Sequence, residues 1–294
     1  MELIFRPLSL EKQNEYKSIF DQCPQKTSDY SFVNLWSWRD IYLLEWAWEE
    51  DLVWIRQNNP ERIYWAPIGP WENIEWKKRL QRCLPTSCAV TRIPEYLYNL
   101  WHSDLPGSLN MADNRDHWDY VYSVQELIEL KGNKYHKKKN LLSQFQRLYQ
   151  ASFVTLTVDE IEGALALQED WCLWRDCESS EVLSAENKAI VDAFKDWTFL
   201  KDVIGGGLVV NQSMISFTVA EPIDQETIVI HFEKGCPQYK GVYQAINQMF
   251  LSWKAQDYTY VNREQDLGDL GLRQAKESYL PVSYLKKYSG HISI

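Results

Sequence analysis

The chain has 294 residues, of which 45% are hydrophobic and 14% aromatic, enough to form the core of one large domain or two ordinary ones. This composition excludes a disordered chain and a small domain held together mainly by disulfides. The net charge of −10 argues against unspecific binding to DNA or RNA backbones, which requires a net basic surface.

The expected location of the protein is the cytoplasm. No segment approaches the roughly 20 apolar residues that cross a bilayer. The N-terminal sequence MELIFRPLSLEKQNEYK lacks the basic segment and apolar stretch of a secretion signal. We therefore expect no transmembrane segment, and we expect the thiols to be reduced.

The six cysteines include two pairs with C-x4-C spacing, Cys83 with Cys88 and Cys172 with Cys177, so a four-thiolate zinc site has to be considered. Zinc ribbons, however, use tighter C-x2-C spacing. Cys172 lies in an apolar, helical pattern, and five further residues of helix would rotate Cys177 by about 140° away from it. We interpret these cysteines as core or surface residues, and no metal site is predicted.

Hydrophobic periodicity and turn residues divide the first half of the chain into short strands and helices. Ser9 is a candidate helix cap, and Pro94 begins a helix. The predicted elements are a strand at 3–6, helices at 9–20 and 33–40, strands at 42–48, 52–56 and 63–66, a helix at 70–82, a strand at 88–92, a helix at 94–101 and a strand at 118–124.

The second half repeats this order after a helix predicted at 136–148. The predicted elements are a strand at 153–158, helices at 161–175 and 185–199, strands at 207–210, 214–221 and 227–233, a helix at 241–254, a strand at 258–262, a helix at 269–277 and a strand at 282–288. Both halves follow β-α-α-β-β-β-α-β-α-β, which predicts an α+β fold with an internal duplication based on element order alone. Eleven acidic and three basic side chains between Asp159 and Asp196 are interpreted as a solvated helical face.

The strand at 227–233 leads through the loop CPQYKG into an amphipathic helix. His231 and Glu233 share one face of this strand. A helix N-terminus presents unpaired N–H groups to anions, Gly241 permits close approach of a ligand, and Lys240 adds positive charge. The pattern indicates a site for phosphate or another anion, with an ordinary strand–loop–helix turn as the alternative.

The element order and the sequence QYKGVY at 238–243 resemble the GNAT acyltransferase superfamily, in which a Q/R-x-x-G-x-G/A loop and the following helix hold the pyrophosphate of an acyl-coenzyme A. Gln238 and Gly241 match this pattern, whereas Tyr243 replaces Gly or Ala and is expected to crowd the loop. The resemblance implies a donor-binding loop that consists of Gln238, Tyr239, Lys240, Gly241, Val242 and Tyr243.

A second resemblance covers nearly the whole chain. It is carried by SDYSF at 28–32 with Leu35 and Trp38, by APIG at 66–69, by the run at 120–145 that begins YVYSVQELIELKGNKYH, and by NREQDLGDLGLRQAKESYLP at 262–281. In these segments the chain is similar to the family of the phosphatidylglycerol lysyltransferase C-terminal domain.

This resemblance implies two tandem GNAT-like folds, each a mixed, mostly antiparallel sheet flanked by helices. The expected domains are residues 1–125 and 126–294, with a helical connector at about 126–150. In lysyltransferases it also implies transfer of an aminoacyl group from aminoacyl-tRNA to a lipid hydroxyl. This sequence departs from the lysyltransferases because no membrane-embedded portion is recognised in it and because its net charge is negative.

Acyl transfer to an amine or hydroxyl needs a base for the acceptor, a group that stabilises the oxyanion and a proton for the leaving group. Glu233 and His231 are candidate bases. Tyr260 and Asn262 end the next strand, where a GNAT-like sheet splays open. We therefore predict catalytic roles for Glu233, His231, Tyr260 and Asn262, with structural roles as the alternative.

Charged residues near these strands are candidate groups for binding a substrate or anion. Five lysines lie within nine residues at 131–139, and a solvated helix start is the alternative interpretation. A buried Arg–Glu pair is the alternative for residues 263 and 264, and solvent contact is the alternative for the pair at 273 and 276. The predicted binding residues are Lys134, His136, Lys137, Lys138, Arg263, Glu264, Arg273 and Lys276. Tyr279 is a candidate proton donor, with a core position as the alternative.

The predicted function is that of a soluble acyl- or aminoacyltransferase. It moves an acyl group from an acyl-coenzyme A or an aminoacyl-tRNA to an amine or hydroxyl acceptor. No tightly bound cofactor and no DNA partner are expected, and the oligomeric state is left open. A non-catalytic ligand-binding or regulatory module on the same fold is the alternative.

Overall fold

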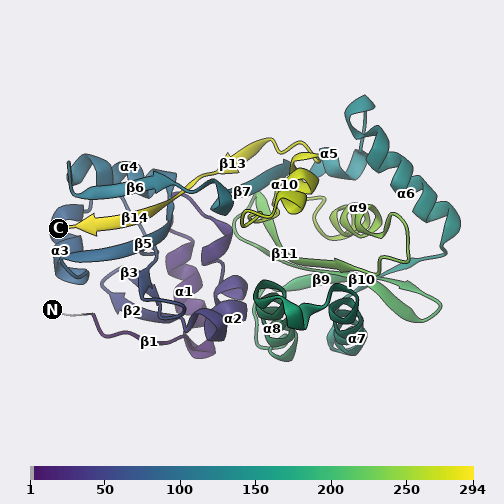
Figure 1. Cartoon of the computed structure of the whole chain (residues 1–294), viewed down its shortest axis with the longest axis horizontal. Helices are drawn as coiled ribbons and strands as arrows, with labels where there is room; N and C mark the ends of the chain where they lie inside the picture. Colours follow the sequence, from purple (N-terminus) through teal and green to yellow (C-terminus); the bar gives the residue numbers. More distant parts are fainter. Residues whose placement is uncertain (1–2) are drawn as a thin grey trace. The chain divides into compact units, whose positions relative to one another are not determined.

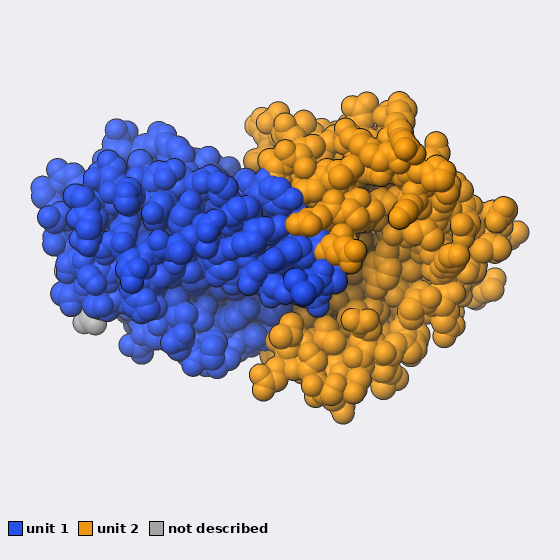
Figure 2. All heavy atoms as spheres, turned by 45° about the horizontal axis from the view of Figure 1, so that its top comes forward, with its two compact units in different colours: residues 1–120, 265–273, 284–294 blue, residues 121–264, 274–283 orange. Residues whose placement is uncertain are grey.

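The computed structural model describes residues 3–294 and shows an α+β protein (Figure 1). These residues form two seven-stranded mixed sheets and ten α-helices. The chain divides into two compact units, which Figure 2 colours separately. The first unit contains the residues up to Tyr120 together with Gln265–Arg273 and Tyr284–Ile294, and the second contains Val121–Glu264 and Gln274–Ser283.

The sheet of the first unit has the strand order β1-β2-β3-β4-β5-β14-β6. β4 and β5 run parallel, and the other neighbouring strands run antiparallel. The strands are β1 (Arg6–Pro7), β2 (Glu45–Glu49), β3 (Leu52–Gln57), β4 (Ile63–Tyr64), β5 (Ser87–Pro94), β6 (Leu109–Asp113) and β14 (Lys287–Ser293). The last strand of the chain therefore lies between two strands of the N-terminal part.

Four α-helices belong to the first unit, namely α1 (Gln13–Phe20), α2 (Phe32–Tyr42), α3 (Trp76–Cys83) and α4 (Glu95–Asp104). The predicted cap Ser9 is confirmed, because its side chain accepts a hydrogen bond from the backbone N–H of Glu11, although the first turn is a 3₁₀ helix. Ser31 caps α2 in a similar way by accepting from the N–H of Asn34. Such caps satisfy N–H groups that have no partner within the helix.

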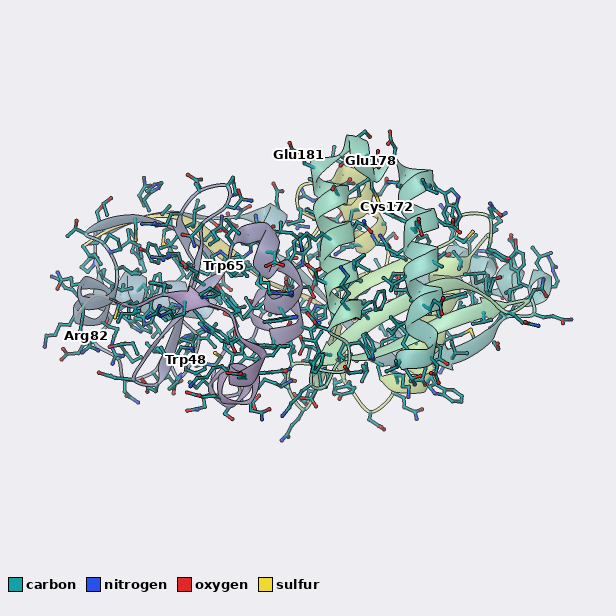
Figure 3. The ribbon with its side chains drawn as sticks, turned by 90° about the horizontal axis from the view of Figure 1, so that it is seen from below. Trp48, Trp65, Arg82, Cys172, Glu178 and Glu181 are labelled. Carbon is teal, nitrogen blue, oxygen red and sulfur yellow. A yellow bond between two sulfur atoms is a disulfide. The ribbon has the colours of Figure 1, made fainter. Side chains whose placement is uncertain are left out.

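Aromatic side chains form much of the core of the first unit. Tyr16 stacks against Trp46 with ring centres 5.7 Å apart, and Trp76 meets Trp101 edge-on, also at 5.7 Å. The guanidinium of Arg92 lies 4.1 Å from the ring centre of Trp65, which Figure 3 labels. Because large rings contribute much buried area, the many tryptophans of the first half stabilise the fold of this unit.

A buried network of two cations and two carboxylates joins β14 to the rest of the first unit. The ammonium group of Lys287, which is fully buried, donates to Asp119 at 2.6 Å and also to Asp29. Arg92 of β5 donates to Asp29 at 2.9 Å. The second carboxylate, Asp119, also accepts from the backbone N–H and the hydroxyl of Ser28. The opposite charges compensate one another in a region from which water is excluded.

The second sheet has the order β13-β7-β12-β11-β10-β9-β8. Its strands are β7 (Asp119–Ser123), β8 (Ser152–Thr155), β9 (Ile204–Val210), β10 (Ser213–Pro222), β11 (Thr227–Gly235), β12 (Tyr260–Asn262) and β13 (Ser283–Leu285). β11 and β12 run parallel, whereas the pairs β7–β12, β10–β11, β9–β10 and β8–β9 run antiparallel. The parallel pair therefore lies between strand pairs that run antiparallel.

Helices cover both faces of the second sheet (Figure 1). They are α5 (Val124–Glu129), α6 (His136–Leu148), α7 (Val158–Arg175), α8 (Glu181–Lys195) and α9 (Val242–Lys254), while α10 (Leu270–Glu277) crosses the division between the units. Glu233 of β11 bonds to Asn247 of α9, whereas the next residue, Lys234, pairs with Glu186 of α8. Because successive strand residues point to opposite faces, α9 packs on one face and α7 and α8 pack on the other.

Most predicted helices and strands are confirmed, with shifts at their ends. The strand predicted at 282–288 is two strands, β13 and β14, and the strand predicted at 3–6 is reduced to β1. β6 was not predicted, because it is short and none of its side chains is buried. The predicted domain boundary at 125/126 lies near the first passage between the units, but the return of the C-terminal residues to the first unit was not predicted.

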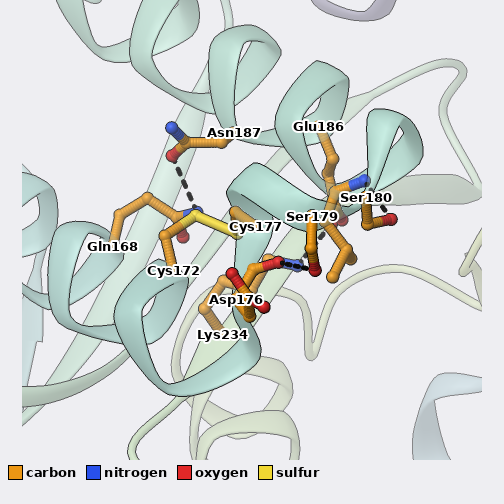
Figure 4. The surroundings of a disulfide bond; sticks show 10 residues. Gln168, Cys172, Asp176, Cys177, Ser179, Ser180, Glu186, Asn187 and Lys234 are labelled. Carbon is orange, nitrogen blue, oxygen red and sulfur yellow. Dashed lines mark hydrogen bonds and ion pairs between the residues drawn. A yellow bond between two sulfur atoms is a disulfide. The ribbon is translucent and has the colours of Figure 1, made fainter.

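The expectation that all cysteines are reduced is wrong for one pair. Cys172 and Cys177 form a disulfide with Cα atoms 4.9 Å apart (Figure 4). The expected rotation of about 140° assumed a continuous helix, but α7 ends at Arg175 and Asp176 adopts a left-handed conformation with φ of 52°. This turn brings Cys177 back towards α7, so neither sulfur is available for a four-thiolate zinc site.

No helix within residues 3–294 has the length and apolar character needed to cross a membrane.

Candidate functional site

The strands β11 and β12 separate at one end of their contact. They are paired only from Thr227 with Tyr260 to Val229 with Asn262, whereas β11 remains paired with β10 as far as Gly235. The pairing therefore ends at Asn262, where the sheet was predicted to splay open. We call the region between β11 residues 230–235 and the residues that follow Asn262 the β11–β12 fork.

Glu233 and Arg263 form an ion pair at the fork. Arg263 Nη2 donates to Glu233 Oε1 at 2.9 Å, and the side-chain amide of Asn247 donates to Glu233 Oε2 at 3.3 Å. The two charged side chains are only 9% and 15% exposed. The predicted base is thus held in a fixed orientation in surroundings of low dielectric constant, where interactions between charges are strong.

Arg263 has a second, unused donor. Its Nη1 is buried and forms no hydrogen bond of normal geometry within residues 3–294, although the Arg263 side chain interacts with the Tyr279 side chain and acts to lower its pKa. The guanidinium lies 5.0 Å from the ring centre of Tyr279 and 5.9 Å from that of Tyr122, and the Arg263 carbonyl accepts from the ammonium of Lys276. A buried donor without an acceptor costs about 1–3 kcal/mol. Nη1 is therefore a candidate contact for an acceptor atom of a ligand.

Tyr279 connects this ion pair to the start of α6. Its hydroxyl accepts from the side-chain amide of Gln244 at 3.3 Å, and the ammonium of Lys138 lies 4.0 Å from its ring centre. Burial raises the pKa of Tyr279, so its hydroxyl keeps its proton at neutral pH. Burial and the charge of Arg263 lower the pKa of Lys138. The site thus has a proton donor next to two cations.

The lysines around the start of α6 differ in their partners. Lys134 pairs with Glu126, and Lys131 pairs with Glu129. Lys137 and Lys139 are exposed and form no ion pair with any residue in the described part of the chain. Lys138, which lies against the Tyr279 ring, also forms no ion pair with a described residue. Positive charge that no carboxylate neutralises favours the binding of anions.

His231 lies between two carboxylates and is not suited to act as a base. It is 1% exposed in its side chain, and its ring nitrogens lie 2.7 Å from Glu264 Oε1 and 3.1 Å from Glu221 Oε1. Burial disfavours the charged ring, but the hydrogen bonds with Glu221 and Glu264 outweigh burial and raise the pKa of His231 to about 9. The ring is therefore protonated at neutral pH, and both of its N–H groups donate.

His231→Gln is expected to remove a pH-dependent contribution to stability. The folded pKa of about 9 exceeds the value of about 6.5 for an unfolded histidine, which corresponds to about 3 kcal/mol. Because the folded pKa is raised, this contribution is complete below about pH 6.5 and is lost as the pH rises through about 9. Urea unfolding between about pH 6 and 9 should show this decline in the natural protein and a flatter profile in the variant.

His102→Gln is the control for this experiment, because His102 is exposed in the first unit and lies between no carboxylates. The control variant should retain the pH profile of the natural protein. Equal pH profiles for His231→Gln and the natural protein would contradict a charged, doubly bonded His231.

The predicted donor loop packs against α6 of the same unit. Gly241 has a φ of 86°, and a Cβ at this position would lie 2.4 Å from the carbonyl oxygen of Leu141. Tyr239 meets Tyr149 edge-on at 4.9 Å, and the Lys240 N–H donates to the Tyr149 hydroxyl at 3.3 Å. The close approach of α6 therefore explains the glycine without a ligand.

Two further residues of this loop, Val242 and Tyr243, lie in the first turn of α9, and Gln238 precedes the helix. The Tyr243 hydroxyl accepts from Trp171 Nε1 of α7 at 3.2 Å and donates to the Gly235 carbonyl at 3.3 Å. Its side chain thus reaches past the end of β11. Val242 is buried, and Gln238 is exposed. The Tyr243 hydroxyl is thus held by two hydrogen bonds within the chain.

Several predicted residues lie away from the fork or serve other contacts. Tyr260 is 37% exposed at the opposite end of the β11–β12 pair. Asn262 is fully buried, and its Oδ1 accepts from the Glu264 N–H at 2.8 Å. His136 contacts Asn140 on the same helix. Arg273, which was predicted to bind a substrate or anion, belongs to the first unit and pairs there with Asp266 and Asp116.

The site also contains residues that the sequence analysis missed. Asn247 and Gln244 lie three residues apart on α9, and Tyr122 lies on β7. Asn247 is 1% exposed. The sequence offered one signal for it, because Asn247 is a polar residue directly beside the apolar stripe of an amphipathic helix, and a buried polar side chain needs a partner. The position of Tyr122 depends on strand pairing across a long sequence separation.

Comparisons with known proteins give one family and one fold. The sequence model of the phosphatidylglycerol lysyltransferase C-terminal family matches residues 20–290. Among solved structures, a conserved protein of unknown function from Bacteroides thetaiotaomicron VPI-5482 is similar to this chain, with 28% sequence identity and a TM-score of 0.88. The alignment covers 99% of each of the two chains. No curated protein matches the chain.

Two further solved structures share the fold at lower identity. The C-terminal domain of a putative lysylphosphatidylglycerol synthetase from Agrobacterium fabrum is 12% identical, with a TM-score of 0.66 over 97% of this chain and 92% of that one. L-PGS from Bacillus licheniformis is 13% identical, with a TM-score of 0.63 over 95% and 90% of the two chains.

Proposed function

Because the chain belongs to the family of the phosphatidylglycerol lysyltransferase C-terminal domain, we propose that it is an aminoacyltransferase with its active site at the β11–β12 fork. The donor is an aminoacyl-tRNA, and the acceptor carries an amine or hydroxyl. Each unit is proposed to be a GNAT-like fold that arose by tandem duplication, with catalysis in the second unit. The proposal places the protein in the cytoplasm, where charged tRNA is made.

The observation that carries this proposal is the position of Lys138. Its ammonium group lies 4.0 Å from the Tyr279 ring centre, and Arg263 lies 5.0 Å from the same ring. Lys138, in the first turn of α6, therefore links this helix through the Tyr279 ring to the buried Glu233–Arg263 pair. A polyanionic donor would contact the exposed lysines while its reactive end reaches the buried pair.

The GNAT-type loop supports aminoacyl-tRNA over acyl-coenzyme A as the donor. Gly241 lies against the Leu141 carbonyl of α6, and Tyr243 bonds to Trp171. The loop and the helix N-terminus are thus partly covered by the chain itself. Phosphate groups of a tRNA bound along the exposed lysines do not require this loop.

The transfer assigns one role to each group at the fork. Glu233 takes the proton from the acceptor while the acceptor nitrogen or oxygen bonds to the ester carbonyl carbon. Arg263 Nη1 donates to the oxyanion that forms on that carbonyl. The bond between the carbonyl carbon and the ribose oxygen then breaks, and Tyr279 protonates the ribose oxygen. The proton held by Glu233 finally returns to Tyr279, so that the protons balance.

The test is release of labelled amino acid from tRNA. Total tRNA charged with a mixture of ¹⁴C-labelled amino acids is incubated with the protein and with separate acceptors, including phosphatidylglycerol vesicles and small amines. The proposal expects label to pass from the acid-precipitable tRNA to one acceptor fraction. Thiol release from acetyl-coenzyme A with no transfer from any charged tRNA would overturn the choice of donor.

A non-catalytic binding module is the second candidate, and one observation favours it. Both of the predicted bases are already engaged, since Glu233 is paired with Arg263 and His231 is held between two carboxylates. This candidate expects charged tRNA to bind with strong salt dependence while no acceptor receives label. Transfer to any acceptor would exclude it.

A further inference from the structure

A side-chain bond crosses the base of the β11–β12 fork. The last parallel pair of the two strands is Val229 with Asn262. The same register, continued by two residues on each strand, would place His231 opposite Glu264. The ladder ends before this position, and the two side chains meet instead, with His231 Nδ1 2.7 Å from Glu264 Oε1. The bond between them therefore takes the place of the next ladder pair.

A β-bulge in β11 accompanies this bond. The register between β10 and β11 shifts between Val219 and Ala220, which leaves His231 as the extra residue of β11. A bulge changes the direction of a side chain, and bulges are frequent beside active sites. At this bulge the imidazole bonds to Glu221 of β10 on one side and to Glu264, beyond the end of β12, on the other.

The segment after β12 depends on side chains for its position, because residues 263–266 have neither helical nor strand structure. Asn262 Oδ1 accepts from the Glu264 N–H at 2.8 Å, and Lys276 donates to the Arg263 carbonyl. The bond between the Glu264 carboxylate and β11 is the third contact, and this carboxylate side chain is only 16% exposed. Glu264 has a φ of 57°, a left-handed conformation that persists in a residue other than glycine only where its surroundings hold it.

Arg263 is directly attached to this anchored residue. Its guanidinium pairs with Glu233 across the same fork at 2.9 Å, so two successive residues after β12 each form one side-chain bond to β11. The proposed transfer needs Arg263 Nη1 at a fixed place, since misplacing a contact by about 1 Å can lower a rate about 10²-fold. The proposed transfer gives no other task to His231 and Glu264.

We propose that Glu264, bonded to His231, is a positioning residue that holds Arg263 in place at the fork. It fixes the backbone where β12 ends and touches neither donor nor acceptor. Hydrogen bonds between charged partners are short and strong, which suits this pair to the task. The effect on transfer rests on the proposed function, whereas the hold on Arg263 is a property of the protein without substrate.

NMR of the full chain labelled with ¹⁵N-arginine tests the hold on Arg263. Arg263→Met identifies the guanidinium N–H signals of this residue by their loss. These signals should be resolved in the natural protein, because the ion pair with Glu233 slows rotation of the guanidinium, and Glu264→Ala should broaden or merge them. Glu264→Gln is the matched control, because it removes the same charge but keeps an oxygen that accepts from His231. Its Arg263 signals should match those of the natural protein.

Single-turnover transfer from charged tRNA tests the consequence. Glu264→Ala should lower the rate constant about 10–10²-fold at an unchanged half-saturating tRNA concentration, whereas Glu264→Gln should stay within about threefold. In an Arg263→Met background, Glu264→Ala should lower the rate constant less than about twofold, because residues that act as a unit are not additive. A residue that only stabilises the fold would give an equal factor in both backgrounds.

Two results would overturn the inference. Unchanged Arg263 signals in Glu264→Ala would show that Glu264 does not hold the guanidinium, and an equal loss of rate in both backgrounds would show that it acts only through general stability. If the signals merge but the natural protein transfers no amino acid from any charged tRNA, the proposed function fails and the hold on Arg263 stands. Urea unfolding verifies that each variant is folded, and Glu264→Asp, whose side chain is too short for the bond to His231, replaces Glu264→Ala if that variant does not fold.

Discussion

Glu233→Gln is expected to lower the rate of aminoacyl transfer about 10²–10⁴-fold, the usual contribution of a positioned general base. Glutamine keeps the shape of the side chain and an oxygen that can accept from Arg263, which now bonds to Glu233 at 2.9 Å. It cannot take a proton from the acceptor. Single-turnover transfer from charged tRNA, measured with the acceptor that the screen identifies, gives the rate constant for the bond-forming step.

Glu226→Gln is the matched control, because Glu226 is an exposed residue directly before β11. It should transfer at the rate of the natural protein. Binding of charged tRNA should be nearly unchanged in both variants, because neither residue belongs to the lysine run at 131–139. A Glu233→Gln variant that is folded and transfers at the natural rate would show that Glu233 is not the base.

Lys287→Met is expected to lower the free energy of unfolding by about 3–5 kcal/mol, the range measured when one partner of a buried ion pair is removed. Lys287 is fully buried, and it donates to both Asp29 and Asp119. Methionine fills a similar volume but leaves two carboxylates facing one remaining cation, Arg92. Urea unfolding at neutral pH measures the loss.

The pH dependence of this network follows from its pKa values. Burial acts to raise the pKa of Asp29, but the charges of Lys287 and Arg92 outweigh burial and lower it. A carboxylate with a lowered folded pKa stabilises the fold above its unfolded pKa of about 3.9, and this contribution is lost as the pH falls through the folded value. The natural protein should therefore have its full contribution at neutral pH, where Lys287→Met is tested.

Lys286→Met provides the control for the loss of one lysine charge. Lys286 precedes β14 and pairs at 3.2 Å with Glu95, and the two side chains are 42% and 37% exposed. Exposed pairs contribute little to stability, so this variant should unfold at nearly the natural urea concentration. If Lys287→Met unfolded there as well, the buried network would not stabilise the position of β14.

Much of the local structure can be predicted because it depends on neighbouring residues. The alternation in β11 and the apolar stripe of α9 predicted both elements, and Ser9 was recognised as a cap. The place where β11 and β12 separate was also predicted, and it brought Glu233 and Arg263 together. The strand and helix patterns repeat every two or about 3.6 residues, so the geometry of the backbone within one segment is enough to relate them to a strand or a helix.

The remaining features depend on contacts between distant segments. Lys138 meets Tyr279 across 141 positions of sequence, and no periodicity relates them. His231 has the residue type of a base, but two carboxylates from other segments keep it protonated. The pairing of Cys172 with Cys177 depends on a left-handed residue at the end of α7, which the helical pattern did not indicate.

The amino-acid sequence by itself determined most of the order of the helices and strands, the α+β class and the candidate carboxylate at the end of β11. Tertiary structure alone decided that β14 joins the first sheet, because the ammonium of Lys287 requires the buried carboxylates of Asp29 and Asp119. It also decided which of the predicted cations meet Glu233. The physical reason is that hydrogen bonding and burial along one segment are local, whereas the compensation of a buried charge requires a partner that chain folding brings from elsewhere.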